Sequence, residues 1–169
     1  MNADGSGRTQ LTKNKSRDHT PSWSPDGTKI VFYTSYNSGL AVIWVMTSDG
    51  TRQTRLTDGS TFDSGPSWSP DGKKIVFQKD WGLMISVIDS DGSNQTWLSE
   101  GDRFNRSRPF WSPDGTKIVF ASKGGISVMN SDGSGRTRLT DNRFYDSDPS
   151  WSPDGTKIAF TSRLSGTLR

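Results

Sequence analysis

A five-residue motif, Trp-Ser-Pro-Asp-Gly, occurs four times in this chain of 169 residues. The copies begin at Trp23, Trp68, Trp111 and Trp151, so successive copies are 45, 43 and 40 residues apart. A period of this length is typical of repeat architectures, in which each repeat is one supersecondary unit. The pair Asp-Gly recurs in phase with the motif at residues 4–5, 49–50, 91–92 and 132–133. The chain length fits one domain, so the sequence predicts one domain of four repeats.

Each repeat is predicted to contain four short strands, and no helical pattern competes with them. The first strand holds the Trp and ends in Pro-Asp-Gly, where Pro presets φ, Asp bonds nearby backbone and Gly accepts positive φ. The second strand is an apolar triplet, which indicates a strand covered on both faces. These triplets are residues 30–32, 75–77, 118–120 and 158–160. Third strands are expected over residues 43–46, 85–88 and 126–129, and fourth strands around Leu11, Leu56, Leu98 and Leu139.

A four-stranded sheet of this size cannot bury both of its apolar faces alone, so each repeat needs a neighbour on either side. The predicted fold is therefore an all-β propeller of four-stranded antiparallel blades, with four blades per chain. The blades span approximately residues 13–57, 58–99, 100–140 and 141–169, and residues 1–12 complete the last one. The residues expected to build this scaffold are Trp23, Asp26, Gly27, Trp68, Asp71, Gly72, Trp111, Asp114, Gly115, Trp151, Asp154 and Gly155.

The first and last residues of the chain carry complementary parts of one blade. Residues 1–12 hold the end of a third strand and a fourth strand, whereas residues 149–169 hold the first two. Four blades in one ring would need steep tilts, so we expect a homodimer that closes one eight-bladed ring by strand exchange between termini. The alternatives are closure within one chain and a fragment of a longer propeller.

The motifs resemble the TolB-like, WD40-like β-propeller repeats, whose hallmark is Pro-Ser-Trp-Ser-Pro-Asp-Gly, Lys-Ile-Ala-Phe, Met-Asn-Ala-Asp-Gly and Leu-Thr. Residues 149–160 match the first half of this hallmark and residues 1–12 match the second. Phe110 replaces the usual Ser, and Ile88-Asp89 replace Met-Asn. The resemblance implies a propeller that serves as an interaction platform, as in the periplasmic Tol system, or as a domain that gates a peptidase.

Composition excludes several classes of protein. The chain has no Cys, which excludes disulfides, thiolate catalysis and zinc sites of the Cys type. The net charge is +3 and the basic residues are dispersed among acidic ones, so nucleic-acid binding is not favoured. No apolar segment approaches the ~18 residues of a membrane span, and the N-terminus lacks a signal-peptide pattern. We expect a soluble protein that is cytoplasmic as written, or periplasmic or secreted if a longer precursor exists.

Catalytic and metal sites are not indicated. The Asp of each pentad recurs in every repeat, which favours a role in the turn over a role in chemistry. Residues 89–94 resemble a calcium loop faintly, but they lack the ligand spacing and the terminal Glu of such a site. His19 is the single His, and no Gly-x-Ser-x-Gly nucleophile motif accompanies it. We therefore expect no catalytic residue, no metal and no cofactor, and place His19 in a loop near the ring entrance.

Residues that differ between repeats are the better candidates for recognition, because variable loops carry binding on a shared scaffold. They cluster in the linkers 13–20, 58–65, 100–108 and 141–148. Hairpin topology puts these linkers on one face with the loops 36–39, 80–82, 123–125 and 163–166, opposite the Asp-Gly turns. We call this the loop face. Aromatic and Arg side chains are common anchors of interfaces, and the candidates are His19, Phe62, Arg103, Phe104, Arg106, Arg108, Arg143, Phe144, Tyr145, Asp146 and Asp148.

These observations favour a non-catalytic scaffold that binds a protein or peptide through the loop face and the central channel, and that binds itself as a dimer. One alternative is that the Phe residues pack under the loops and the charges are solvated. Others are a propeller hydrolase or lyase, a carbohydrate-binding module, and a fragment or engineered minimal repeat without a ligand.

Overall fold

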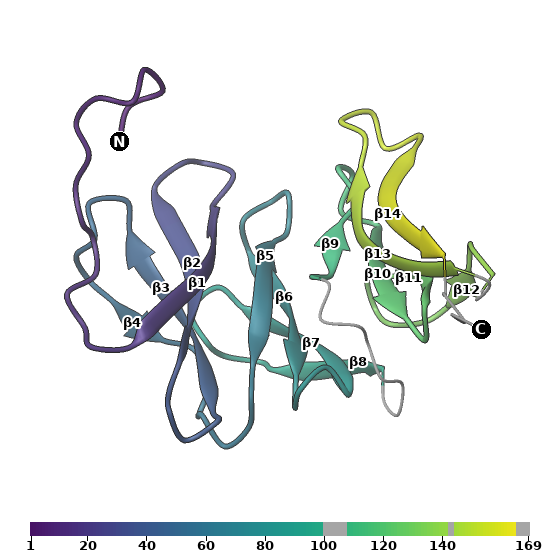
Figure 1. Cartoon of the computed structure of the whole chain (residues 1–169), viewed down its shortest axis with the longest axis horizontal. Coiled ribbons are helices and arrows are strands. Elements are labelled where there is room, and N and C mark those ends of the chain that lie inside the picture. The colour runs from purple at the N-terminus through teal and green to yellow at the C-terminus, as the bar shows by residue number, and fades with distance from the viewer. Residues whose placement is uncertain (100–107, 142–143, 165–169) are drawn as a thin grey trace.

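All regular secondary structure in the described residues is β-strand (Figure 1). The computed structural model describes residues 1–99, 108–141 and 144–164, with the backbone alone at residues 144 and 164. None of these residues forms a helix that could span a membrane. The strands make three four-stranded sheets and one two-stranded sheet, each with its strands paired antiparallel in chain order.

The strand bounds follow the predicted repeats. The first sheet contains β1 (Arg17–Trp23), β2 (Lys29–Ser35), β3 (Ala41–Thr47) and β4 (Thr54–Arg55). The second contains β5 (Ser64–Trp68), β6 (Lys74–Lys79), β7 (Met84–Asp89) and β8 (Thr96–Ser99). The third contains β9 (Phe110–Trp111), β10 (Lys117–Ser122), β11 (Gly125–Asn130) and β12 (Thr137–Arg138). The two-stranded sheet contains β13 (Phe144–Trp151) and β14 (Ile158–Leu164).

Each pentad forms the turn between the first two strands of its sheet. In the first sheet, Asp26 Oδ1 accepts hydrogen bonds from Ser24 Oγ at 2.6 Å and from the Thr28 backbone N–H at 3.0 Å. The same two bonds recur at the other three pentads, on Asp71, Asp114 and Asp154. At Asp114, donation from Ser112 and then from Thr116 lowers the pKa of the carboxyl to about 2, because both bonds favour its charged form. The short side chains thus hold the tight turn without help from neighbouring sheets.

The second strands of the first three sheets are buried on both faces, as their apolar triplets predict. Val31 points toward the second sheet, where it packs with Ile75 and Phe77. Val76 lies on the opposite face of β6 from Ile75 and Phe77, and it packs with Ile118 and Phe120 of the third sheet. The core therefore consists of layers between neighbouring sheets. Residues 158–160 form the predicted strand, but the described residues do not cover it on both faces: Ala159 is exposed and Phe160 is 43% exposed, and no described sheet lies beyond β14.

The four sheets follow one another along an arc (Figure 1). Their first strands are the inner ones, and contacts join β1 to β5, β5 to β9 and β9 to β13. Residues 1–12 lie at one end of the arc and the β13–β14 sheet lies at the other (Figure 1). The fourth strand predicted around Leu11 is not formed, because the sheet that it would extend lies at the far end. Leu11 nevertheless packs on Ile30, Phe32 and Met46 of the first sheet.

Candidate functional site

A β-bulge in three of the four inner strands, β1, β5 and β13, turns one residue of the strand toward the axis of the arc. The pairing register shifts between His19 and Ser22 in β1, and at the equivalent places in β5 and β13. The bulged residue precedes the repeated Pro and has positive φ, with values of 49° at Thr20, 62° at Gly65 and 52° at Asp148. Non-glycine residues rarely adopt this conformation. The surrounding sheet therefore imposes it at Thr20 and Asp148, which is common at binding sites.

These bulged residues border a cavity of about 510 Å³ on the inner side of the arc. Ligand pockets in proteins span roughly 300–1,000 Å³, so the cavity is large enough for a small molecule or for a few residues of a peptide. All four sheets contribute to its wall. The lining residues are Thr20, Tyr33, Phe62, Ser64, Gly65, Gln78, Trp81, Arg108, Phe110, Asp148, Pro149 and Ser150.

A ladder of four aromatic rings leads across the first two sheets into this cavity. The His19 ring stacks on Tyr33 at a centroid distance of 4.8 Å, and Tyr33 meets the edge of Phe62 at 6.0 Å. Phe62 in turn stacks on Trp81 at 4.2 Å. Trp81 is 53% exposed, so the ladder ends in a ring that offers a free face to solvent. The Trp81 backbone N–H also donates to the Phe62 carbonyl at 3.1 Å, which ties the β6–β7 turn to the linker before β5.

The turn that presents Trp81 has an unusual backbone. Asp80, Trp81 and Gly82 all have positive φ, at 52°, 59° and 78°. Trp81 and Gly82 are the central residues of the turn, because the Leu83 backbone N–H donates to the Asp80 carbonyl at 3.0 Å. Two central residues with positive φ are typical of the type I′ turn, where Asn and Gly are the common choices. A Trp at this position carries a conformational cost, and such costs are often found at functional sites.

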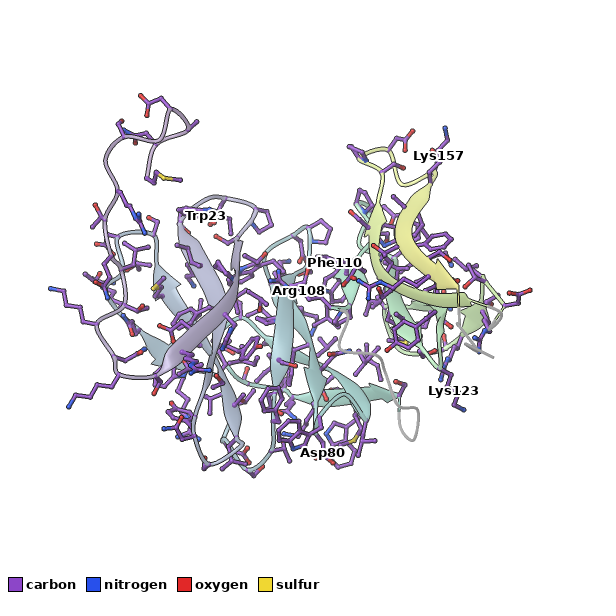
Figure 2. All side chains as sticks on the ribbon, in the orientation of Figure 1. Trp23, Asp80, Arg108, Phe110, Lys123 and Lys157 are labelled. Atoms are coloured by element: carbon purple, nitrogen blue, oxygen red, sulfur yellow. The ribbon has the colours of Figure 1, made fainter. Side chains whose placement is uncertain are left out.

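Arg108 supplies positive charge on the other side of the cavity, next to Phe110 (Figure 2). A side chain on Gly65 would lie 3.1 Å from Cγ of Arg108, so the absence of a side chain there lets the Arg approach the second sheet. Burial lowers the pKa of the Arg108 guanidinium, and the neighbouring Tyr33 and Asp148 act in the opposite direction. Arg stays protonated in proteins, so the cavity combines a partly desolvated cation with aromatic faces.

A buried ion pair lies behind the aromatic ladder. Asp63 is fully buried and its Oδ2 lies 3.6 Å from the Nζ of Lys79. Asp63 also accepts a hydrogen bond from Thr61 Oγ1 at 2.8 Å, and its backbone N–H donates to the Ala41 carbonyl at 3.2 Å. The pair thus fixes the linker that carries Phe62.

The structure brings part of the predicted set together. Phe62, Arg108 and Asp148 line the cavity, and His19 reaches it through Tyr33. His19 lies in strand β1 and not in a loop, because residues 17–19 pair with residues 33–35 of β2. Tyr145 is half exposed on β13 and is outside the cavity lining. Arg103, Phe104, Arg106, Arg143 and the side chain of Phe144 lie outside the described residues.

Asp146 is buried rather than available on the loop face. It is 2% exposed, and its Oδ1 accepts a hydrogen bond from Ser162 Oγ at 2.5 Å. Its backbone N–H donates to the Gly124 carbonyl at 3.1 Å. The first sheet has the same arrangement at Asp18, whose Oδ1 accepts from Thr34 Oγ1 at 2.7 Å. These carboxylates therefore attach the linkers to the sheets.

Several lining residues escaped the sequence reasoning because they lie in strands or hairpin turns. Thr20 and Ser150 belong to the inner strands, and Tyr33 and Gln78 belong to second strands. Of these residues, Trp81 could have been identified from the sequence, because a Trp in a hairpin turn does not serve the turn itself and therefore suggests another role. Within the described part of the chain, no group of three His, Cys, Asp or Glu residues could hold a metal ion.

Comparison with known proteins connects this arrangement to one family. Residues 1–127 match the family described as the TolB beta propeller domain. TolB from Acinetobacter baumannii is 26% identical to the chain, with a TM-score of 0.82 over 98% of this chain and 42% of that one. The chain therefore spans less than half the length of that protein. No curated protein sequence matches the chain.

Two further solved structures share the fold. The putative TolB from Agrobacterium tumefaciens is 23% identical, with a TM-score of 0.68 over 94% of this chain and 74% of that one. An oligogalacturonate lyase in complex with manganese is 20% identical, with a TM-score of 0.69 over 94% of this chain and 48% of that one. Likeness at these identities concerns the fold alone. The comparisons confirm the all-β propeller fold that the repeats predict.

Proposed function

The chain belongs to the TolB β-propeller domain family, and we propose that it is a non-catalytic scaffold that binds a protein or peptide at the loop face and the central cavity. The observation that carries this proposal is the aromatic ladder that runs from His19 to Trp81 and borders the cavity beside Arg108. Trp, Tyr and Arg are enriched among residues that dominate binding energy. A peptide side chain could stack on Trp81 while the Arg108 guanidinium donates hydrogen bonds to a backbone or side-chain oxygen of the peptide.

The surroundings of His19 support binding over catalysis. Its Nε2 lies 2.9 Å from Ser35 Oγ, and its ring stacks on Tyr33. The ring is thus fixed at the base of the ladder. An acyl-transfer site would need, besides a hydroxyl such as Ser35 Oγ, a carboxylate that orients the imidazole. Among the described residues His19 bonds Ser35 and no carboxylate, and its stacking on Tyr33 gives the ring a packing role.

Peptide selection from a displayed library of random 12-residue sequences tests the proposal. Enriched peptides are expected to bind the wild-type chain and to lose at least tenfold in affinity on Trp81→Ala, about 1.4 kcal/mol. Arg108→Gln should weaken binding in the same direction. Trp97→Ala is the matched control, because Trp97 is 57% exposed against 53% for Trp81 and lies on the outer strand β8. The proposal would be overturned if no peptide were enriched, or if neither Trp81→Ala nor Arg108→Gln changed the affinity for the enriched peptides.

A carbohydrate-binding module is the second candidate, favoured by the exposed face of Trp81 stacked on Phe62. Aromatic faces stack on sugar rings as they do on other apolar surfaces. Titration with chitohexaose and with oligogalacturonate, followed by Trp fluorescence, separates the candidates. Saturable quenching that Trp81→Ala abolishes and Trp97→Ala preserves would favour the sugar. Unchanged fluorescence would exclude these sugars as ligands and leave the peptide as the remaining candidate.

Self-association through the terminal segments is part of the proposed function. Among the described residues, the last sheet has two strands where the others have four, and residues 1–12 carry the motif of a third-strand end and a fourth strand. Unpaired sheet edges readily accept a further strand. A scaffold that completes its last sheet with the N-terminal segment of another copy would enclose the cavity on all sides.

A further inference from the structure

The two ends of the arc expose surfaces that are buried between all other neighbouring sheets. Trp23 is 58% exposed, whereas Trp68 at the equivalent place is 7% exposed. Trp68 packs on the first sheet, and its Nε1–H donates to the Ser22 carbonyl at 3.2 Å. Trp151 makes the same bond to the Phe110 carbonyl of the preceding sheet at 3.4 Å. The corresponding acceptor for Trp23 would be the carbonyl of Ser150.

A second series of contacts joins the pentad turns of successive sheets. A Cβ placed on Gly72 would lie 3.6 Å from Cδ of Pro25. The equivalent distances are 3.7 Å between Gly115 and Pro70, and 3.6 Å between Gly155 and Pro113. Within the described residues, the same position on Gly27 has no neighbouring atom within 4 Å. The series therefore lacks one pair, Pro153 with Gly27.

A third series joins the fourth-strand Leu of each sheet to the Asp-Gly turn of the next. A Cβ on Gly50 would lie 2.9 Å from the Leu11 carbonyl oxygen, and a Cβ on Gly133 would lie 2.6 Å from the Leu98 carbonyl oxygen. Leu56 is the corresponding neighbour of Gly92. Leu139 is 49% exposed. Gly5 has nothing within 4 Å among the described residues. The missing pair is Leu139 with Gly5.

The N-terminal turn already has the shape of its counterparts in the first three sheets. Asp4 Oδ1 accepts bonds from the backbone N–H and the Oγ of Ser6 at 2.9 and 2.7 Å, as Asp91 does from Ser93. The φ of Gly5 is 86°, against 91° for Gly92. In Figure 1 this turn stands away from the sheets. It is thus preorganised for a contact that the described residues of its own chain do not offer.

We propose that these end surfaces bind one another head to tail between two copies of this chain. Trp23, Gly27 and Gly5 of each copy pack on Ser150, Pro153 and Leu139 of the other. The contact continues the Pro–Gly and Leu–Gly pairs, each of which occurs three times within the chain. It also continues the Trp bond, which occurs at Trp68 and Trp151 but not at Trp111, whose Nε1 has no hydrogen-bond partner among the described residues. It rests on the self-association part of the proposed function and specifies its residues, but it is independent of the ligand. The two surfaces lie at opposite ends of the arc, so the described residues of one copy do not bring them together (Figure 1).

A head-to-tail contact gives a closed ring only when its rotation returns to the start, and otherwise gives open filaments. Two copies would place eight sheets in one ring with two equivalent seams. Light scattering of the chain at micromolar concentration is expected to give one species of twice the 18.7 kDa chain mass. A single-chain mass would overturn the proposal and assign the end surfaces to further sheets of a longer polypeptide. Masses that grow with concentration would overturn the closed pair.

Substitutions at the end surfaces test the assigned residues. Trp23→Glu and Leu139→Glu are each expected to give the single-chain mass, with at least a tenfold increase in the dissociation constant of the pair. Both side chains are exposed in the single chain, so circular dichroism should show unchanged β-structure. Trp97→Glu is the control, because its Trp is exposed to the same degree as Trp23 but lies away from both ends. Pairs that survive both end substitutions would overturn the assignment.

Peptide binding separates this inference from the proposed ligand site. Leu139→Glu chains that are single but still bind the selected peptides would locate the ligand site within one copy. Trp81→Ala chains are expected to lose peptide binding and to keep the mass of the pair. Loss of pairing on Trp81→Ala would contradict the assigned seam, since Trp81 lies on the loop face between the first two sheets.

Discussion

The second sheet and the first sheet carry the same pentad, yet they bury it to different degrees. The turns are alike, since Ser24 bonds Asp26 and Ser69 bonds Asp71 at 2.6 Å in both cases. The Trp residues are not alike, with 58% of Trp23 exposed against 7% of Trp68. Local sequence therefore determines the turn, while burial depends on whether another sheet precedes it.

The last sheet shows the same dependence of burial on a neighbouring sheet, on the face that points away from the third sheet. Val76 in β6 is fully buried by the third sheet, whereas Ala159 at the same place in β14 is exposed. Solenoid and propeller repeats owe their stability to nearest-neighbour interfaces in addition to their own structure. The middle of the molecule has two such interfaces per sheet, and each end has one.

The largest expected difference between middle and end is at the Trp positions. Trp68→Ala should lower the free energy of unfolding by about 4 kcal/mol, because it leaves a cavity between two sheets and removes the bond to Ser22. Trp23→Ala should lower it by less than about 1 kcal/mol in the single chain, since the side chain is already exposed. Urea unfolding at concentrations where the chain is single measures both. Equal losses would mean that Trp23 is buried without a second copy.

The carboxylates of Asp63 and Asp18 should show a somewhat smaller difference between the middle and the end of the molecule in the free energy of unfolding. Asp63→Ala leaves the buried Lys79 without its counter-ion, which should cost about 3 kcal/mol. Asp18→Ala, at the equivalent place in the first sheet, removes the bond from Thr34 and the exposed bonds from the Asn14 amide, and should cost about 1 kcal/mol because no charge is left buried without a partner.

The double variant Asp63→Ala, Lys79→Met provides the control for the ion pair. It should recover most of the loss in urea unfolding, because the remaining side chain carries no charge to bury. A double variant no more stable than Asp63→Ala would show that the loss comes from the linker hydrogen bonds of Asp63 and not from Lys79.

The sequence alone was enough for the scaffold because turn chemistry is local. Pro-Asp-Gly and the apolar triplets predicted the hairpins, the second strands and the packing of sheets on sheets, and the structure agrees in the first three repeats. The triplet at 158–160 forms its strand as predicted, whereas its cover on both faces depends on a neighbouring sheet that the described residues do not supply.

The candidate site was less predictable because it depends on backbone geometry that no residue type announces. The bulges at Thr20 and Asp148 turn strand residues toward the cavity. Similarly, the stacking of Phe62 on Trp81 joins residues from a linker and a hairpin. Asp146 resembled a surface charge, yet it bonds Ser162 inside the sheet. Such contacts follow from tertiary placement, which residue patterns do not encode.

Two glycines with almost the same backbone separate packing from conformational strain. Gly133 has φ of 89° and Gly5 has φ of 86°, so Ala is equally strained at both. An added Cβ would lie 2.6 Å from the Leu98 carbonyl at Gly133 and would meet nothing described within 4 Å at Gly5. We expect Gly133→Ala to cost about 2 kcal/mol more than Gly5→Ala, as overpacking does. Equal losses in the free energy of unfolding, measured in urea, would mean that the Leu98 backbone moves away from the added Cβ at no cost.

The smallest difference between middle and end is expected in acid, because the pentad carboxylates act within their own turns. Donation from Ser24 and then from Thr28 lowers the pKa of Asp26 in the first sheet, as donation from Ser69 and then Lys73 does for Asp71 in the second. A carboxyl with a lowered folded pKa stabilises fully above its unfolded value of about 4. That contribution is lost as the pH falls, and for Asp114 the loss ends near its folded pKa of about 2. Asp26→Asn and Asp71→Asn should therefore remove equal parts of the fall in melting temperature between pH 5 and pH 2. A larger effect at Asp71 would show that neighbouring sheets, and not the turn alone, hold its charge.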